Sequence, residues 1–246
     1  MSLRRLRSLK HSRGQTTLST ESSSAGMPPL KGLRASSAET LSSPGTQTRS
    51  LSKLPPLDES AWRILDFDLE TLAAGFADPE WVPQKITVAA WSWIGEEEVH
   101  YATALKPGFF DRRLRVRALM PLVKAIWEAD VVTGHNLLRF DLPVLNAELM
   151  RAGLNPLPNL WVQDTMKFPK SKGLKKSQDD VSLMVGSEQR KLSLNWEEWD
   201  RAYEVKGWPL VIERCKTDVL AHKEMREGLA AQNALDKPRK WRSRKP

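Results

Sequence analysis

Four acidic residues in three short segments of the chain have the types and order of a metal site. The segments read FDLET at residues 67–71, HNLLRFD at 135–141 and CKTDV at 215–219, and their acids are Asp68, Glu70, Asp141 and Asp218. Brought together in a fold, these carboxylates would repel one another at neutral pH unless divalent cations lay between them. Two such cations about 4 Å apart, held by carboxylate oxygens, are a common device for cleaving phosphodiester bonds. The sequence therefore predicts a site for two divalent ions, Mg²⁺ or Mn²⁺.

The first acidic segment lies on a predicted strand. Apolar residues alternate with acids over residues 62–70, so period-two geometry puts Asp66, Asp68 and Glu70 on one face. Thr71 and the Ala-Ala-Gly that follows end this strand. Asp68 and Glu70 are thus expected at its carboxyl end, where the functional sites of α/β sheets usually lie.

The second and third segments belong to predicted helices. A short strand stops at Gly134, and a helix begins near Asp141, where free backbone N–H groups and the helix dipole favour the charged carboxylate. His135 and Asn136, in the turn between, can order the loop or contact a substrate. Another helix is expected from Pro209 to about residue 232, with Asp218 beside its apolar stripe.

These residues resemble the DEDD family of 3′-to-5′ exonucleases, within the ribonuclease H-like superfamily. Asp68 and Glu70 match its first motif, Asp141 its second and Asp218 its third, and the resemblance covers residues 62–229. It implies an α/β fold with a mixed five-stranded sheet flanked by helices. It also implies two bound divalent ions and removal of single nucleotides from a 3′ end. Asp68 would bridge both ions, Glu70 and Asp218 would hold the ion that activates water, and Asp141 would help to hold the second.

One position departs from the family pattern. Members usually carry a tyrosine four residues before the last aspartate or a histidine five before it, whereas this chain has Arg214 and Glu213. The resemblance is closer to the tyrosine branch, and an arginine cannot act as a general base at neutral pH. Three interpretations remain open. In the first, the metal alone activates water; in the second, Arg214 pairs with Asp218 or contacts phosphate; in the third, the domain binds nucleic acid without cutting it.

A lysine-rich segment from Lys167 to Lys176 is the best candidate for gripping a nucleic-acid backbone, although such runs are often solvated loops. Ser177, with Asp180 three residues later, predicts a helix cap just after it. The candidate nucleic-acid contacts are Thr71, Asn136, Lys175, Lys176 and Arg214.

Between the motifs, the chain alternates between strand and helix patterns. Strands are predicted at 85–94 and 97–104, joined as a hairpin at Gly95, and a last strand at 160–164. A helix is predicted to begin at Pro121.

Composition divides the chain into a disordered arm at 1–55, a folded domain at 56–232 and a basic tail at 233–246. The arm is rich in Ser and Thr and holds nine Lys or Arg against two Glu, while residues 237–246 hold six basic residues and no acid. Such ends can attract phosphates or can simply be solvated.

The N-terminal arm and the apolar content bear on where in the cell the protein is expected. The arm suggests organellar import, a disordered extension, or translation from upstream of a true start at Met27 or later. We otherwise expect the cytoplasm of a bacterium or phage host. No apolar stretch is long enough to span a membrane, and the lone Cys215 excludes an internal disulfide.

The function expected first is a DNA 3′-to-5′ exonuclease in replication or repair, because the CKTDV segment resembles the branch attached to DNA polymerases. An RNA-trimming exonuclease is the alternative, since contacts to the 2′-OH cannot be identified from one sequence. A nucleic-acid-binding module without catalysis is the third possibility. A proofreading role would require a separate DNA polymerase or replication protein as partner.

Overall fold

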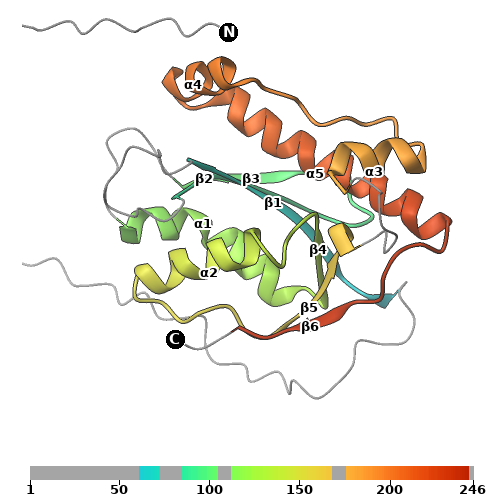
Figure 1. Ribbon diagram of the computed structural model, residues 1–246. Helices are drawn as coiled ribbons and strands as arrows, with labels where there is room; N and C mark the ends of the chain where they lie inside the picture. The colour runs from blue at the N-terminus through green and yellow to red at the C-terminus, as the bar shows by residue number, and fades with distance from the viewer. Residues whose placement is uncertain (1–60, 73–84, 105–111, 168–175, 244–246) are drawn as a thin grey trace, which may run out of the picture. The chain divides into compact units, whose positions relative to one another are not determined.

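A computed structural model describes residues 61–72, 85–104, 112–167 and 176–243, all within one compact unit of the chain. Its centre is a six-stranded mixed sheet in the order β3-β2-β1-β4-β5-β6 (Figure 1). The strands are β1 Ile64–Leu72, β2 Lys85–Trp93, β3 His100–Thr103, β4 Val131–Gly134, β5 Leu160–Asp164 and β6 Arg239–Trp241. The central pairs β1–β4 and β4–β5 are parallel, and the other neighbours are antiparallel. The predicted arm at 1–55 lies outside the described residues.

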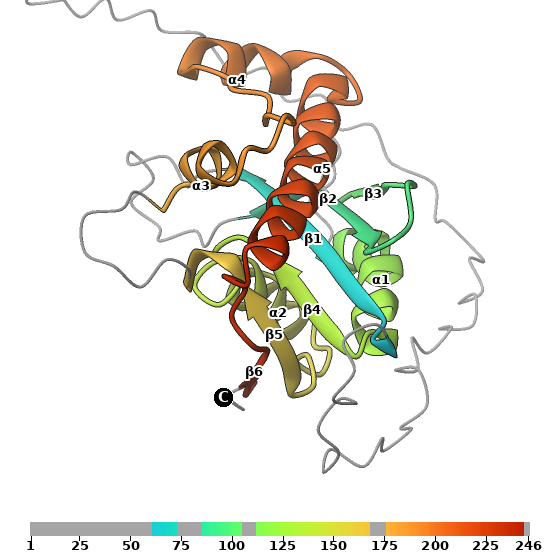
Figure 2. The same cartoon turned by 90° about the vertical axis from the view of Figure 1, so that its right-hand side faces the viewer.

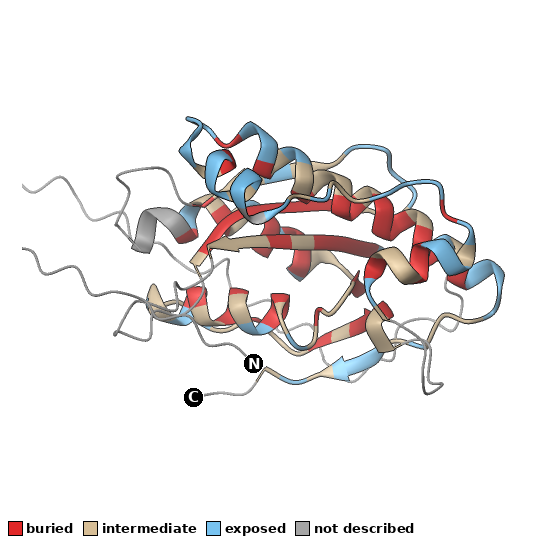
Figure 3. Cartoon of the chain, turned by 45° about the horizontal axis from the view of Figure 1, so that its top comes forward, coloured by how far each residue is buried: buried red, intermediate tan, exposed pale blue. Residues whose placement is uncertain are grey.

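Five α-helices are found in the described residues. They are α1 Arg112–Glu128, α2 Asp141–Arg151, α3 Gln178–Val185, α4 Trp196–Glu204 and α5 Pro209–Ala231, and a short 3₁₀ helix, η2, spans Thr165–Lys167. Figures 1 and 2 show α5 on one face of the sheet and α1 and α2 on the other. Buried residues follow the strands and the inward sides of these helices (Figure 3).

The two faces of the sheet have separate apolar cores. Phe67 and Ala89 pack with residues of α1 and α2, whereas Val88 and Ala90 pack with Val211 and other residues of α4 and α5. Successive side chains of β2 therefore contribute to different cores, since they point to opposite faces of the sheet. Among the described residues, no helix has both the length and the apolar character to cross a membrane.

The predicted number of strands is wrong by one. Arg239–Trp241, in the predicted basic tail, forms β6 and pairs antiparallel with β5, with Trp241 opposite Leu160. Trp241 packs against the larger apolar core. The strand was not predicted because this single apolar residue among basic residues gives no alternating pattern.

The predicted start of the first long helix is also wrong, because Pro121 lies inside α1 and not at its beginning. Val116 and Leu119 are buried on the same stripe as the residues after the proline, so the apolar pattern continues upstream. The other predicted helix landmarks are confirmed. α2 begins at Asp141, α5 begins at Pro209, and the Ser177 side chain accepts a hydrogen bond from the Asp180 backbone N–H at the start of α3.

Gly134 closes β4 where the chain turns toward the second acidic segment, and it has no room for a side chain. A Cβ atom there would lie 2.8 Å from Leu137 Cγ and 2.9 Å from the backbone oxygen of Phe67. We expect Gly134→Ala to lower the free energy of unfolding by about 1–3 kcal/mol, the usual cost of overpacking. Urea denaturation measures this, and a change within about 0.5 kcal/mol, as at an ordinary surface position, would contradict it.

Candidate active site

The first two acids lie in the part of β1 that continues past its last pair with β4, Asp66 and Thr133, near the middle of the sheet. Asp68 and Glu70 share one face of the strand, and the pairing with β2 shifts register between Glu70 and Thr71. The parallel neighbour β4 ends at Gly134, so the chain leaves the sheet at this same edge before it enters α2. β1 nevertheless continues past both acids to Leu72, so the predicted position near the end of the strand holds for Glu70, whereas Asp68 is the middle residue of the strand.

The third element of the site is α5, which crosses the sheet next to β1. It brings Asp218 so close that single carboxylate oxygens of Asp68, Glu70 and Asp218 all lie within 4.8 Å of one another. The Gln178 side chain donates a 2.8 Å hydrogen bond to the backbone carbonyl of Asp218 and ties α5 to the start of α3. Three of the four predicted acids therefore form one compact cluster.

Asp141 adjoins this cluster from the start of α2. Its carboxylate accepts a hydrogen bond from the backbone N–H of Leu69, and Asp68 is the charged neighbour that most raises its pKa. Asp141 is only 3% exposed. The fourth predicted acid therefore lies at the start of α2, next to Asp68 of the first motif.

Burial and mutual repulsion raise the pKa values of these acids. Burial, followed by the charge of Glu70, raises the pKa of Asp68 to about 7. The pKa of Glu70 is raised to about 7 by burial against the opposing effect of Arg214, and that of Asp218 to about 7 by burial and Asp68. The helix start was predicted to favour the charged form of Asp141, and in the protein without metal other effects act in the opposite direction. Burial and Asp68 outweigh the helix and hold the pKa of Asp141 well above its usual value.

The chemistry of this cluster fits a divalent cation. Asp141 Oδ1 and Asp218 Oδ1 are buried and have no hydrogen-bond partner in the described part of the chain. Buried carboxylate oxygens without a donor are costly, and a hard cation would satisfy them while it relieves the repulsion. The residues that could hold metal are Asp68, Glu70, Asp141 and Asp218.

A cleft of about 420 Å³ opens beside the acids. Its lining consists of Asp68, His135, Asn136, Met166, Lys176, Ser177, Gln178, Lys191 and Asp218. The predicted contacts Asn136 and Lys176 belong to this lining, whereas Thr71 does not. The predicted contact Lys175 lies outside the described residues.

Lys191 is a cleft residue that sequence reasoning missed. It lies in the irregular segment between α3 and α4, and its charge lowers the pKa values of Asp68, Glu70 and Asp218. A single lysine with no motif around it carries no signal in the sequence. Lys191 and Lys176 nevertheless give the cleft two cationic side chains from separate segments of the chain.

No protein-family model matches this chain, and no curated protein matches its sequence. A solved structure does match it in three dimensions. The family B DNA polymerase from the hyperthermophilic archaeon Pyrobaculum calidifontis superposes with a TM-score of 0.51 at 21% identity. The match covers 69% of this chain and 24% of that chain, so the chain corresponds to about a quarter of the polymerase. The fold is ribonuclease H-like. The predicted α/β fold class is therefore confirmed.

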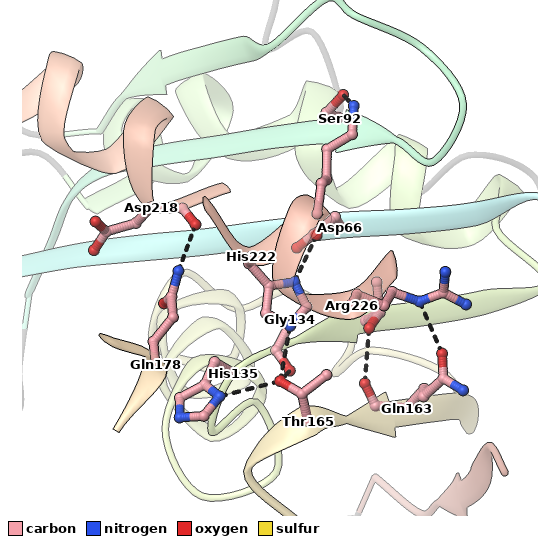
Figure 4. Close-up of polar contacts among 12 residues, drawn as sticks. Asp66, Ser92, Gly134, His135, Gln163, Thr165, Gln178, Asp218, His222 and Arg226 are labelled. Atoms are coloured by element: carbon pink, nitrogen blue, oxygen red, sulfur yellow. Dashed lines mark hydrogen bonds and ion pairs between the residues drawn. The ribbon is translucent and has the colours of Figure 1, made fainter. Parts of the chain in front are cut away.

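In this ribonuclease H-like domain, a chain of hydrogen bonds beneath the cleft fixes the loop before α2 (Figure 4). His222 bridges Asp66, at 2.6 Å, and Thr165, at 2.8 Å, and Thr165 in turn contacts His135 at 3.1 Å. The other ring nitrogen of His135 lies 2.7 Å from the backbone carbonyl of Lys176. Both ring nitrogens are therefore engaged, so His135 orders the loop and is not free to accept a proton from substrate.

His222 and Asn136 also have defined structural roles. His222 is buried, with Asp66 as its partner. Asn136 adopts a left-handed backbone conformation, φ 71°, and its backbone N–H donates to Asp164 Oδ1 at 2.9 Å. Asparagine tolerates this conformation better than most residues, so the loop turns sharply into the cleft at this position.

Arg214 binds the acids directly. Its Nε lies 2.9 Å from Glu70 Oε1, and its side chain also forms an ion pair with Asp218 at 3.7 Å. The predicted pairing of Arg214 with Asp218 is thus observed, together with a shorter contact to Glu70 that the sequence did not indicate. Glu70 is distant in sequence, so only the packing of α5 on β1 could reveal this pair.

Proposed function

We propose that this protein is a divalent-metal-dependent 3′-to-5′ exonuclease that acts on DNA. The observation that carries the proposal is the group of carboxylates from Asp68, Glu70 and Asp218, with Asp141 beside it, next to a cleft with two lysines. The similarity of the fold to part of a DNA polymerase supports DNA as the polymer. Action in replication or repair, with a separate polymerase or replication protein as partner, belongs to the same proposal.

The four acids would hold Mg²⁺ or Mn²⁺. When bound, such ions lower the pKa of water and stabilise negative charge on phosphodiester oxygens. Asp68 is the central ligand, because Glu70, Asp141 and Asp218 are all its electrostatic neighbours. How many ions bind depends on Arg214, which already contacts two of the acids.

The chain's own cationic and polar groups would bind the substrate backbone. Lys176 and Lys191 line the cleft, where their charges attract phosphate oxygens, and the Asn136 side chain can donate a hydrogen bond. Neither Arg214 nor His135 can take a proton from the attacking water. Arginine remains protonated, and both ring nitrogens of His135 are already engaged.

A nucleic-acid-binding module without catalysis is the second candidate. The observation that favours it is the ion pair between Arg214 and Glu70, because this contact occupies a carboxylate oxygen that a metal would otherwise use. The cleft with its two lysines would be retained in such a module. Tight binding of oligonucleotides without metal-dependent shortening would identify it.

The deciding experiment is a time course with single-stranded DNA and RNA oligonucleotides, each labelled at the 3′ or the 5′ end. Reactions contain Mg²⁺, Mn²⁺ or a chelator. We expect 5′-labelled DNA to shorten one nucleotide at a time, and 3′-labelled DNA to release labelled mononucleotide first, only with metal present. Faster shortening of RNA would make the protein an RNA-trimming exonuclease. Intact oligonucleotides in every lane would refute an exonuclease of either kind.

Lys191→Ala tests the assignment of the cleft as the substrate site. A hydrogen bond to a charged group contributes about 1.5–3 kcal/mol, so we expect oligonucleotide affinity to fall at least about tenfold. The slope of log affinity against log salt should decrease by about one, since one phosphate contact is lost. The matched control is Lys124→Ala on α1, where the lysine is exposed and distant from the cleft lining. Equal affinity of the two variants would contradict the assignment.

A further inference from the structure

Arg214 uses all three nitrogens of its guanidinium group within the protein. Nε bonds Glu70, one terminal nitrogen bonds the backbone carbonyl of Leu192, and the other faces Asp218. The side chain is only 14% exposed. These contacts engage each guanidinium nitrogen and hold the positive charge beside the acids.

The surroundings of Arg214 hold it in this position. Its guanidinium carbon lies 5.0 Å from the ring centre of Trp199 on α4, a favourable cation–π distance. The start of α4 is fixed by a capping box, in which Asn195 and Glu198 each bond the other's backbone N–H. Trp199 also stacks on Tyr203, whose hydroxyl lies 3.0 Å from Thr87 Oγ1. Helix α4 thus acts as a support for the arginine.

The guanidinium occupies the part of the cluster where Glu70 and Asp218 meet. Glu70 Oε1 is taken by Arg214, whereas the buried Oδ1 atoms of Asp141 and Asp218 have no hydrogen-bond partner among the described residues. The carboxylate oxygens that still need a positive partner therefore lie on Asp141 and Asp218, which both adjoin Asp68. A cation that satisfies them would bind around Asp68 and not around Glu70.

We propose that the Arg214 guanidinium replaces one of the two cations expected from the sequence, so that the site binds a single divalent ion through Asp68, Asp141 and Asp218. The charges agree with this number. When all four carboxylates are ionised, the positive charges of Arg214 and of the nearby Lys191 oppose two of the four negative charges, and one divalent ion balances the other two. Arg214 is then a built-in cation for Glu70, and it stabilises negative charge in place of a second metal.

This inference rests on the proposed metal-dependent function of the same site, but its test needs no substrate. Mn²⁺ is titrated into the full-length chain at pH 8, and bound ions are counted from the electron paramagnetic resonance signal of free Mn²⁺. We expect one Mn²⁺ per wild-type chain and two per Arg214→Gln chain, because glutamine removes the charge and leaves Glu70 free. Arg214→Lys keeps a positive charge and should still bind one.

The matched control is Arg201→Gln on α4, where the arginine is exposed and pairs only with Glu197 in the described structure. It should bind one ion, as the wild type does. Two tight ions, or none, in the wild-type protein would overturn the inference, even if Arg214→Gln failed to fold. One ion in a folded Arg214→Gln protein would overturn it as well.

The ion count and the cleavage assay can fail separately. A protein that binds one Mn²⁺ but never shortens an oligonucleotide refutes the exonuclease and leaves the role of Arg214 supported. A protein that shortens oligonucleotides and binds two ions refutes only the proposal that Arg214 replaces a cation, and it leaves the exonuclease supported.

Discussion

Asp68→Asn should reduce the rate of metal-dependent cleavage at least about 100-fold, because residues that merely support a metal ligand already cost about 10- to 100-fold when they are changed. Asp68 adjoins Glu70, Asp218 and Asp141, so the proposed metal site depends on it. An amide of the same shape keeps the packing but removes the negative charge. The measurement is the initial rate of shortening of 5′-labelled DNA in saturating Mg²⁺.

The control for this variant is Asp200→Asn, the same chemical change at an exposed position of α4. It should retain the wild-type rate. Asp68→Asn that keeps more than about a tenth of that rate would contradict the assignment of Asp68 as a direct metal ligand. Inactivity of Asp68→Asn should not result from unfolding, because removing one of several acids that repel one another should make the metal-free protein more stable.

The second large effect concerns stability and pH. Without metal, the free energy of unfolding should decrease as the pH rises through about 7. Asp68, Glu70 and Asp218 have pKa values of about 7 in the folded protein and ordinary values near 4 when unfolded. Between those values the folded state binds more protons than the unfolded state, so stability is present at low pH and is lost as these carboxyls ionise.

His135 changes the free energy of unfolding in the opposite direction over part of this pH range. Burial, with the nearby His222, lowers the pKa of His135 to about 4, so its contribution to stability is lost as the pH falls from 6.5 through 4. Above pH 6.5 this contribution is complete, and the acids alone determine the slope. Urea denaturation in chelator should therefore show a decrease from pH 6.5 to 7.5 that levels off by pH 8.5, where these carboxyls are ionised in both states.

Divalent metal should reverse the decrease. An ion that binds only the folded protein at 100 times its dissociation constant adds about 2.7 kcal/mol of stability. The ion competes with protons for the same oxygens, so its effect should be large at pH 8 and small at pH 5. Stability that is unchanged from pH 6.5 to 8.5 in chelator, or an equal gain from Mg²⁺ at pH 5 and 8, would contradict this account.

The sequence was most informative where a residue's local pattern also determined its place in the fold. Alternation along residues 62–70 put Asp68 and Glu70 on one face of a strand, and helical spacing put Asp141 at a helix start. The structure has both arrangements. The parallel strands β1 and β4 run toward the same end of the sheet. Their order in the sequence is therefore enough to predict that acids from different motifs come close together.

Interactions between distant segments could not be predicted in the same way. The bond between Arg214 and Glu70 and the place of Lys191 in the cleft both depend on how α5 and the segment before α4 pack. The raised pKa of Asp141 depends on burial, which the helix dipole argument does not include. Strand β6 was not predicted because it is formed by its pairing with β5, and its own residues show no strand pattern.

Strand β6 also decides whether the outer edge of the sheet is open to other chains. β5 would otherwise present a row of unpaired backbone groups, the feature through which sheets join one another and aggregate. The covering strand holds Arg239 and Lys240, both exposed, whose charges discourage a further strand from adding. Gln163 and Asn146 fasten the same terminal segment through Asp236 and Ser243. Residues 236–243 therefore protect this side of the sheet, whatever they contribute to binding phosphate.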